Sequence, residues 1–246
     1  MKEIITSIEN QKIKNIRKLL ENKNILKEKK FIIENDNLIE EAYKNEMLLE
    51  AYALIDYDNY LNLDLIYVSE KVMKSISDLK STPKIIGISK IKENNELGEK
   101  IVLLDNVQDP GNIGTIIRNC VAFGVDTLVL SKDCANIYSK KVLRSCVGMI
   151  YNINIIIEDL ENIIPKIKEK NIKVISTTLD ATSEINQINK DKYAIIFGNE
   201  GNGIREELIE KSDMKVKIEM SAKCESLNVG VSSGIILYNI FRGKHE

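Results

Sequence analysis

The sequence is poor in the residues that several common kinds of active site require. It has one histidine, His245, in the second-last position, so a Ser-His-Asp or Cys-His nucleophile system has no credible base. The four cysteines, Cys120, Cys134, Cys146 and Cys224, form no C-x-x-C pair, which argues against a zinc ribbon or a thioredoxin motif. We therefore expect buried free thiols and no metal centre.

Long apolar runs and phosphate-binding patterns are also lacking. No apolar run approaches the roughly 20 residues of a membrane span, and the N-terminus lacks the apolar segment of a signal peptide. We therefore expect a cytoplasmic protein without membrane contact. The glycine-rich stretch "GNEGNG" (198–203) has neither the G-x-G-x-x-G spacing nor the G-K-[ST] ending of nucleotide phosphate loops. Some other ligand or constraint has to explain its glycines.

Charge is nearly balanced overall but segregated along the chain. A net charge of −2 argues against a strongly basic nucleic-acid-binding domain. Residues 1–33, however, carry nine basic and four acidic side chains, whereas residues 34–64 carry one basic and nine acidic ones. Two interpretations stay open: solvated helix faces of opposite sign, or a first segment that contacts phosphates.

Apolar periodicity predicts two α/β domains within the 246 residues. Residues 1–90 form a small α/β domain, residues 91–99 are a polar linker, and residues 100–246 form the second domain. In the second domain, continuous apolar strands alternate with helices, which indicates a mostly parallel sheet buried on both faces. In the first domain we expect helices at 7–20, 37–55 and 70–79 and strands at 31–35, 63–69 and 84–90.

Three polar and glycine-rich clusters follow strands of the second domain. They are "DNVQDPGNIGTIIRNC" (105–120), "FGNEGNGI" (197–204) and "IEMSAKCESLNVGVSSGI" (218–235). Ligands bind at this edge of open α/β sheets. In this order and spacing, the clusters resemble the SpoU/TrmH family of RNA 2′-O-ribose methyltransferases, part of the SPOUT class. The resemblance covers residues 100–242, and residues 1–90 more loosely resemble the ribosomal-protein-like substrate-binding domain that precedes many members.

The resemblance implies a trefoil-knot fold, the cofactor S-adenosylmethionine (SAM), and a homodimer with its active site near the interface. It implies that the catalytic residues are Arg118, Asn112, Glu200, Ser226 and Asn228. It implies that the cofactor is bound by Thr177, Gly198, Gly203, Ile218, Met220, Leu227 and Asn228. We expect the glycines, Gly198 above all, to let the backbone approach the adenosine without a Cβ atom in the way.

Arg118 is the residue on which the chemistry depends. In the family the matching arginine is proposed as the base, although a free guanidinium stays protonated. Either the phosphate of the target helps to carry the proton, or a low-dielectric site makes the arginine a better acceptor, and both alternatives stay open. Two interpretations of Glu200 stay open: it orients Arg118 through a carboxylate–guanidinium fork, or it is a loop carboxylate that bonds helix N–H groups. Asn112 and Asn228 would hold Arg118 or the ribose by amide hydrogen bonds.

Several positions depart from the family pattern. Glu219 replaces a usual proline, Gly230 replaces a serine, and Asn35 replaces a glycine in the first domain. Cys146 and Val147 stand where the family prefers Ser and Ala. These departures concern the shape of the site and the choice of substrate, because the five catalytic candidates are all retained.

The resulting functional prediction is SAM-dependent 2′-O-ribose methylation of structured RNA. The first domain favours large-subunit (23S) ribosomal RNA, since it resembles the domain found in ribosomal enzymes. The alternatives are a tRNA 2′-O-methyltransferase, a catalytically inactive RNA-binding adaptor, and a base or small-molecule methyltransferase. The presence of Arg118 and Asn112 disfavours the adaptor, and the lack of a suitable cysteine motif disfavours base methylation.

Overall fold

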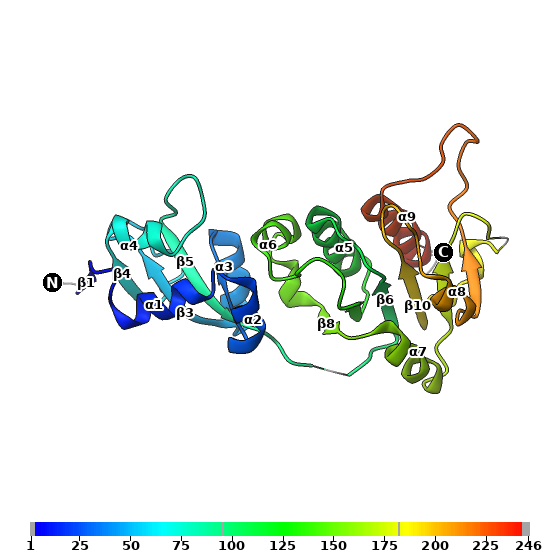
Figure 1. Ribbon diagram of the computed structural model, residues 1–246, viewed down its shortest axis with the longest axis horizontal. Helices are drawn as coiled ribbons and strands as arrows, with labels where there is room; N and C mark the ends of the chain where they lie inside the picture. The colour runs from blue at the N-terminus through cyan, green and yellow to red at the C-terminus, as the bar shows by residue number, and fades with distance from the viewer. Residues whose placement is uncertain (1–2, 95, 182, 243–246) are drawn as a thin grey trace. The chain divides into compact units, whose positions relative to one another are not determined.

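The computed structural model describes residues 3–94, 96–181 and 183–242, so His245 lies outside the described residues. The chain divides into two compact units. The first comprises residues up to 93 together with Tyr138–Leu143, and the second comprises residues 94–137 and those from 144 onward. The change of unit at 93–94 falls within the polar segment predicted as a linker (Figure 1).

The first unit contains a mixed five-stranded sheet in the order β1-β4-β3-β5-β2. β4 runs parallel to β1 and β3, whereas β5 is antiparallel to β3 and β2. Apolar residues of the first helix, such as Ile13 and Ile16, share a buried cluster with Tyr52 and Ile86 of the sheet. The elements are β1 (Ile4–Ile5), α1 (Gln11–Lys18), α2 (Asn22–Glu28), β2 (Lys30–Ile33), α3 (Asp36–Lys44), β3 (Leu48–Ala53), β4 (Leu65–Val68), α4 (Glu70–Ser75) and β5 (Ile85–Lys90).

The prediction of one helix over 37–55 is wrong. The helix α3 ends at Lys44, and Glu46 has a positive φ of 57° that turns the chain into strand β3. β3 lies between β4 and β5, so its pairing on both sides overrides the helix propensity of its Leu, Glu and Ala residues. The predicted helix over 7–20 corresponds to α1 alone, which is shorter at both ends, and α2 and the two-residue strand β1 were not predicted.

The second unit contains a six-stranded sheet in the order β11-β9-β10-β6-β7-β8, in which every strand pair is parallel. This confirms the predicted α/β class with a mostly parallel sheet. The elements are β6 (Lys100–Leu104), α5 (Pro110–Ala122), β7 (Thr127–Leu130), α6 (Lys140–Cys146), the first part of which is assigned to the first unit, η1 (Met149–Asn152), β8 (Asn154–Ile157), α7 (Leu160–Glu169), β9 (Val174–Thr177), η2 (Ile185–Gln187), β10 (Tyr193–Phe197), α8 (Glu206–Glu210), β11 (Met214–Val216) and α9 (Val229–Arg242).

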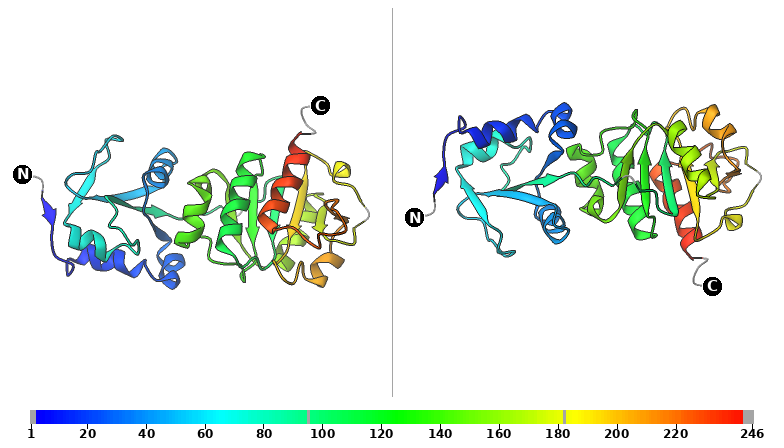
Figure 2. Two further views of the ribbon diagram at one scale, coloured as in Figure 1. Left: turned by 90° about the horizontal axis from the view of Figure 1, so that it is seen from above. Right: turned by 90° about the horizontal axis from the view of Figure 1, so that it is seen from below.

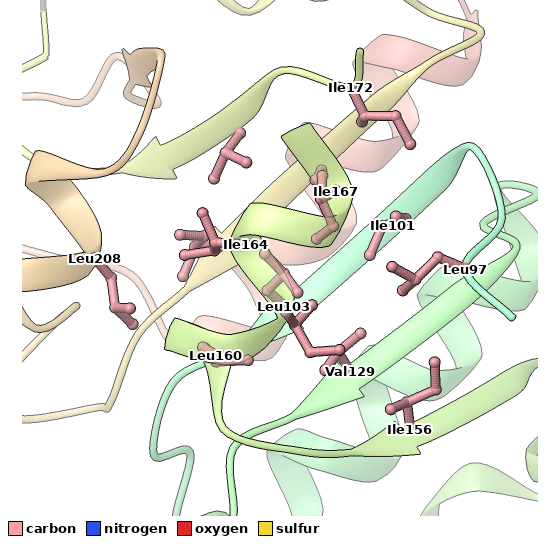
Figure 3. Close-up of a cluster of buried hydrophobic side chains, with 14 of the residues drawn as sticks. Leu97, Ile101, Leu103, Val129, Ile156, Leu160, Ile164, Ile167, Ile172 and Leu208 are labelled. Carbon is pink, nitrogen blue, oxygen red and sulfur yellow. The ribbon is translucent and has the colours of Figure 1, made fainter. Parts of the chain in front are cut away.

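One face of the parallel sheet is covered by α7. Figure 3 shows Leu160, Ile164 and Ile167 of this helix turned toward side chains of the sheet that include Leu103 and Val129. All of these side chains are almost completely buried. This cluster makes the sheet a rigid support for the loops at its carboxyl edge.

Helices α5 and α9 lie side by side (Figure 2). The Asn119 side chain donates a hydrogen bond of 2.9 Å to the carbonyl of Gly230. A Cβ atom at Gly230 would lie 3.1 Å from Thr115 Cγ2, closer than ordinary contact. The glycine that replaces the family's serine therefore allows the two helices to approach each other closely.

No helix in the described ranges is long and apolar enough to cross a bilayer.

Candidate active site

A cavity of about 480 Å³ lies in the second unit, at the carboxyl edge of the sheet. Strands β9, β10 and β6 are neighbours in the sheet, so the loops that follow them meet at one place. The walls come from the ends of β9 and β10, from the segment after β11, and from the start of α9. All seven predicted cofactor residues line it: Thr177, Gly198, Gly203, Ile218, Met220, Leu227 and Asn228.

The glycine loop (residues 198–204) has a compact shape held by its own backbone. Asn199 and Gly203 exchange two backbone hydrogen bonds of 2.9 and 3.0 Å. The Asn199 side-chain oxygen accepts from the amides of Gly201 and Asn202. Gly203 has a φ of +71°, a conformation that side chains disfavour.

Gly198 is a glycine for a reason that the sequence did not indicate. A Cβ atom there would lie 2.3 Å from the carbonyl carbon of Gly203 and 2.4 Å from the nitrogen of Ile204. A side chain at this position would therefore displace the loop itself, and the close approach of this backbone to the adenosine stays a prediction. Gly198 does line the cavity, but its missing side chain makes room for the loop's own backbone.

A hydrogen-bonded chain joins the three sequence clusters. Glu200 accepts from the side chain of Asn112 at 2.8 Å and from the amides of Gln108 and Asp109 at 3.2 and 3.1 Å. The Asn112 oxygen accepts from Asn228 Nδ2 at 2.9 Å. Since a carboxylate can only accept, the orientation of both amides follows from Glu200.

The same chain of bonds controls the ionisation of Glu200. Partial burial alone would raise the pKa of this carboxyl, but the bonds from Asn112 and the two amides outweigh burial and hold the pKa below its usual value. Glu200 is therefore an anion at neutral pH that fixes the first turn of α5 to the glycine loop.

Asn112 and Asn228 lie at the starts of helices. Asp109 caps α5 by accepting from the amide of Asn112, and Pro110 takes the first helical position. Asn228 caps α9, because its oxygen accepts from the amide of Val231 while its nitrogen bonds Asn112. Helix α9 thus begins at Val229, and Ser226 and Asn228 belong to the loop before it.

Arg118 is not brought into this chain of bonds. It is exposed on α5 and forms no hydrogen bond or ion pair within the described ranges. The predicted fork with Glu200 is wrong, because Glu200 accepts from Asn112 and from two amides at the start of α5, as the other interpretation of this carboxylate predicted. The asparagines do not bond Arg118 either, and their contact with the ribose stays a prediction. Six helical positions separate Arg118 from Asn112, which turns their side chains about 120° apart around the helix.

The cysteines offer no nucleophile in this site. Cys120 and Cys146 are buried and Cys134 partly so, and burial raises the pKa of all three thiols. Cys224 is exposed, contrary to the prediction of buried thiols, and its Sγ lies 3.3 Å from the carbonyl oxygen of Ser226. The described residues include no group of three or more His, Cys, Asp or Glu that could hold a metal ion.

Sequence reasoning missed the role of Asn199. Its side chain organises the glycine loop and donates a 2.7 Å bond to the carbonyl of Asn106 in the loop after β6. The available signal was the Asn-Glu-Gly order, because asparagine before a glycine turn often bonds the backbone two residues on.

Comparison with known proteins agrees with this geometry. Residues 99–238 match the model of the SpoU rRNA Methylase family, and residues 10–87 match the MRM3-like substrate binding domain. The chain belongs to the SpoU rRNA methylase family. Both resemblances noted in the sequence are thereby confirmed.

Individual relatives of this SpoU-family chain extend over nearly its whole length. The Bacillus subtilis 23S rRNA (guanosine(2553)-2′-O)-methyltransferase RlmP is 32% identical over 243 residues, covering 96% of this chain and 98% of the relative. A crystal structure of an RNA 2′-O ribose methyltransferase is 26% identical, with a TM-score of 0.81, and covers 99% of this chain and 100% of that chain. The AdoMet-bound rRNA methyltransferase from Sinorhizobium meliloti, 24% identical with a TM-score of 0.85 over 98% of both chains, shares the fold.

Proposed function

We propose that this chain transfers a methyl group from SAM to a ribose 2′-oxygen of large-subunit ribosomal RNA. The observation that carries the proposal is the single cavity lined by all seven predicted cofactor residues, joined through Glu200 to Asn112 and Asn228. The family and the full-length similarity to RlmP, which is named for 23S rRNA, support the reaction and the substrate.

The cavity fits SAM in size and chemistry. Its volume is within the roughly 300–1,000 Å³ typical of small-molecule sites. Ile218, Met220 and Leu227 supply apolar surface for a purine, while Thr177 and the backbone of the glycine loop supply polar groups. When bound, SAM supplies an electrophilic methyl group on a sulfonium sulfur.

The residues of the chain would act mainly by positioning. Direct displacement requires the 2′-oxygen in line with the sulfur–methyl bond, so orientation supplies much of the rate. Asn228 lines the cavity and is held by Asn112, so its amide would have a fixed orientation at the SAM site. Arg118, which is exposed and bonds none of the described residues, would hold the phosphate or ribose of the target nucleotide and orient the leaving proton. Ser226, also at the cavity, would add a hydroxyl donor.

The first unit would recognise the RNA. It matches a substrate-binding domain, and its basic residues gather on α1 and α2. Arg17 and Lys18 are exposed in the last turn of α1, where they are available to phosphates. The proposal also includes the domain roles predicted from the sequence, a chain threaded as a trefoil knot, and a cytoplasmic location.

The proposal includes a homodimer that uses α9. Val231 and Tyr238 of this helix are 51% and 48% exposed, although other apolar residues of the helix, Ile236, Leu237 and Ile240, are buried. Tyr238 forms an edge contact with Phe123 of α5, with ring centroids 5.8 Å apart. Such an apolar face is suited to a second copy of the chain. Tyr238→Asp should give monomers in sedimentation measurements, whereas unchanged sedimentation would contradict this interface.

Methyl transfer is tested with tritium-labelled SAM and ribosomal RNA that lacks the modification. Nuclease digestion and nucleoside analysis should recover label in a 2′-O-methylnucleoside of 23S rRNA. Label in tRNA only, or in a base, would contradict the proposed substrate or reaction. Binding of RNA without any label, from a protein that also fails to bind SAM, would favour an inactive adaptor.

A further inference from the structure

The side chain of Asp105 is buried without a role in the proposed reaction. It follows strand β6 and is only 1% exposed, and no other charged residue in the described ranges is as deeply buried. It does not line the cavity. Since a buried charge is costly unless it is paired and hydrogen-bonded, its partner indicates what it does.

That partner is Arg205, the residue directly after the glycine loop. The Asp105 oxygens accept from the backbone amide of Arg205 at 2.8 Å and from its Nε at 2.9 Å. Arg205 is the N-cap residue of α8 and makes no capping bond with its own side chain. One carboxylate therefore holds both the backbone and the side chain of the residue at which the loop ends.

The start of the glycine loop is tied to the same segment. The amide of Asp105 donates to the carbonyl of Phe197, and the Asn199 side chain donates to the carbonyl of Asn106. Both ends of the loop are thus attached to two consecutive residues after β6. The ends differ in kind, because the start is held by neutral hydrogen bonds and the end by an ion pair.

We propose that Asp105 and Arg205 are positioning residues that hold the glycine loop in its SAM-binding shape. The loop contains three glycines, whose backbones are free to adopt many conformations when they are not restrained. If the loop became ordered only when SAM binds, the entropy cost of ordering it would weaken binding. The ion pair instead holds the loop in order before SAM binds. This inference rests on the proposed function, since the ligand is SAM.

A matched pair of variants tests it. Arg205→Met removes the side-chain half of the pair, and Lys211→Met removes an ion pair at the other end of α8, where Lys211 Nζ lies 2.7 Å from Glu161. Each variant removes one positive charge and one ion pair from the same short helix. Hydrogen exchange of the loop amides without SAM, the SAM dissociation constant by calorimetry, and kcat at saturating SAM are measured for both.

Arg205→Met should make the loop amides exchange about tenfold faster and weaken SAM binding about tenfold, with kcat nearly unchanged. Lys211→Met should match the unaltered protein in all three measurements. A role in overall stability alone would change exchange across the unit rather than in the loop. Equal loop exchange and equal SAM affinity in the two variants would overturn the proposal.

Asp105→Asn tests the other half of the pair. Its amide nitrogen would face a second donor, so one bond would be lost, and adding Arg205→Met should cause little further loss because the two residues act as a unit. Additive losses in the double variant would contradict a coupled pair. If Asp105→Asn does not fold, the Arg205 and Lys211 variants decide the question. Failure of the unaltered protein to bind SAM would instead contradict the proposed function. Hydrogen exchange of the loop amides would still test whether Asp105 and Arg205 hold the loop.

Discussion

The cavity and Arg118 belong to the same unit but are built in opposite ways. The cavity is surrounded by loops whose polar groups are bonded to one another, from Asp105 and Arg205 at one end of the glycine loop to Asn228 at the start of α9. Arg118 lies on a well-ordered helix but is exposed and bonds none of these groups. We infer that the cofactor half of the site is complete in one chain, whereas the substrate half is completed by RNA or by a second subunit.

Arg118→Ala tests most directly whether the cofactor half and the substrate half of the site are independent. The variant should lose about 10²–10⁴-fold in kcat, because a group that orients the proton and the target is removed. Its SAM affinity should be unchanged, because Arg118 does not line the cavity. Turnover and calorimetry check the two halves separately. Near-normal turnover would show that Arg118 is not catalytic, and weakened SAM binding would show that the two halves are not independent.

The opposite pattern is expected from Gly198→Ala. The added methyl group would overlap the backbone of Gly203 and Ile204, so the loop must shift and SAM binding should weaken by about 100-fold or more. Gly201→Ala is the matched control, because the same methyl group there would lie 3.6 Å from Asn199, an ordinary contact. Equal SAM affinities of the two folded variants would show that the loop's shape does not determine binding.

The second unit, strand β3 and the site differ in how far the sequence could predict them. Residue order and periodicity were sufficient for the second unit, since its central strands β6, β7 and β10 are mostly apolar and almost fully buried, and the clusters fall at one edge of the sheet. They failed at β3, because Leu48–Ala53 contains helix-forming residues whose strand conformation depends on pairing with β4 and β5. For the site, the resemblance supplied the identities of the candidate residues but not their hydrogen-bond partners. Which side chain Glu200 bonds depends on the rotation of α5, which no local pattern encodes.

Glu200→Gln tests the bonds that join the two halves. The neutral amide would turn a donor toward one of the three groups that now donate to Glu200, at a cost of about 1–3 kcal/mol. We expect SAM affinity and kcat each to fall about tenfold. Glu210→Gln, an exposed change in the same unit, should have no effect on either. Equal behaviour of the two variants would mean that the chain of bonds is not needed for function.

The lowered pKa of Glu200 also predicts how these bonds respond to acid. The contribution of the carboxylate to folding is present above the ordinary value of 4.5 and is lost as the pH falls through the lower folded pKa. The difference in unfolding free energy between the unaltered protein and Glu200→Gln should therefore be constant from neutral pH to about 5 and shrink below it. Denaturant titrations at several pH values measure it. A difference that already shrinks between pH 7 and 6 would contradict this assignment.

The smallest effect is expected in the first unit, where the comparison is between two basic surfaces. Arg17→Gln with Lys18→Gln removes two exposed charges from α1, and Lys71→Gln with Lys74→Gln removes two from α4. If α1 contacts phosphates, each lost contact should lower the slope of log affinity against log salt by about 0.7–0.9, so the α1 variant should lose roughly 1.5 in slope. Filter binding of ribosomal RNA at several salt concentrations measures this slope for both variants.

The α4 variant should keep the slope of the unaltered protein, because the predicted basic segment ends at residue 33. Equal slopes for the two variants would favour the other interpretation of the charge pattern, in which the basic residues of α1 form a solvated face that does not contact RNA.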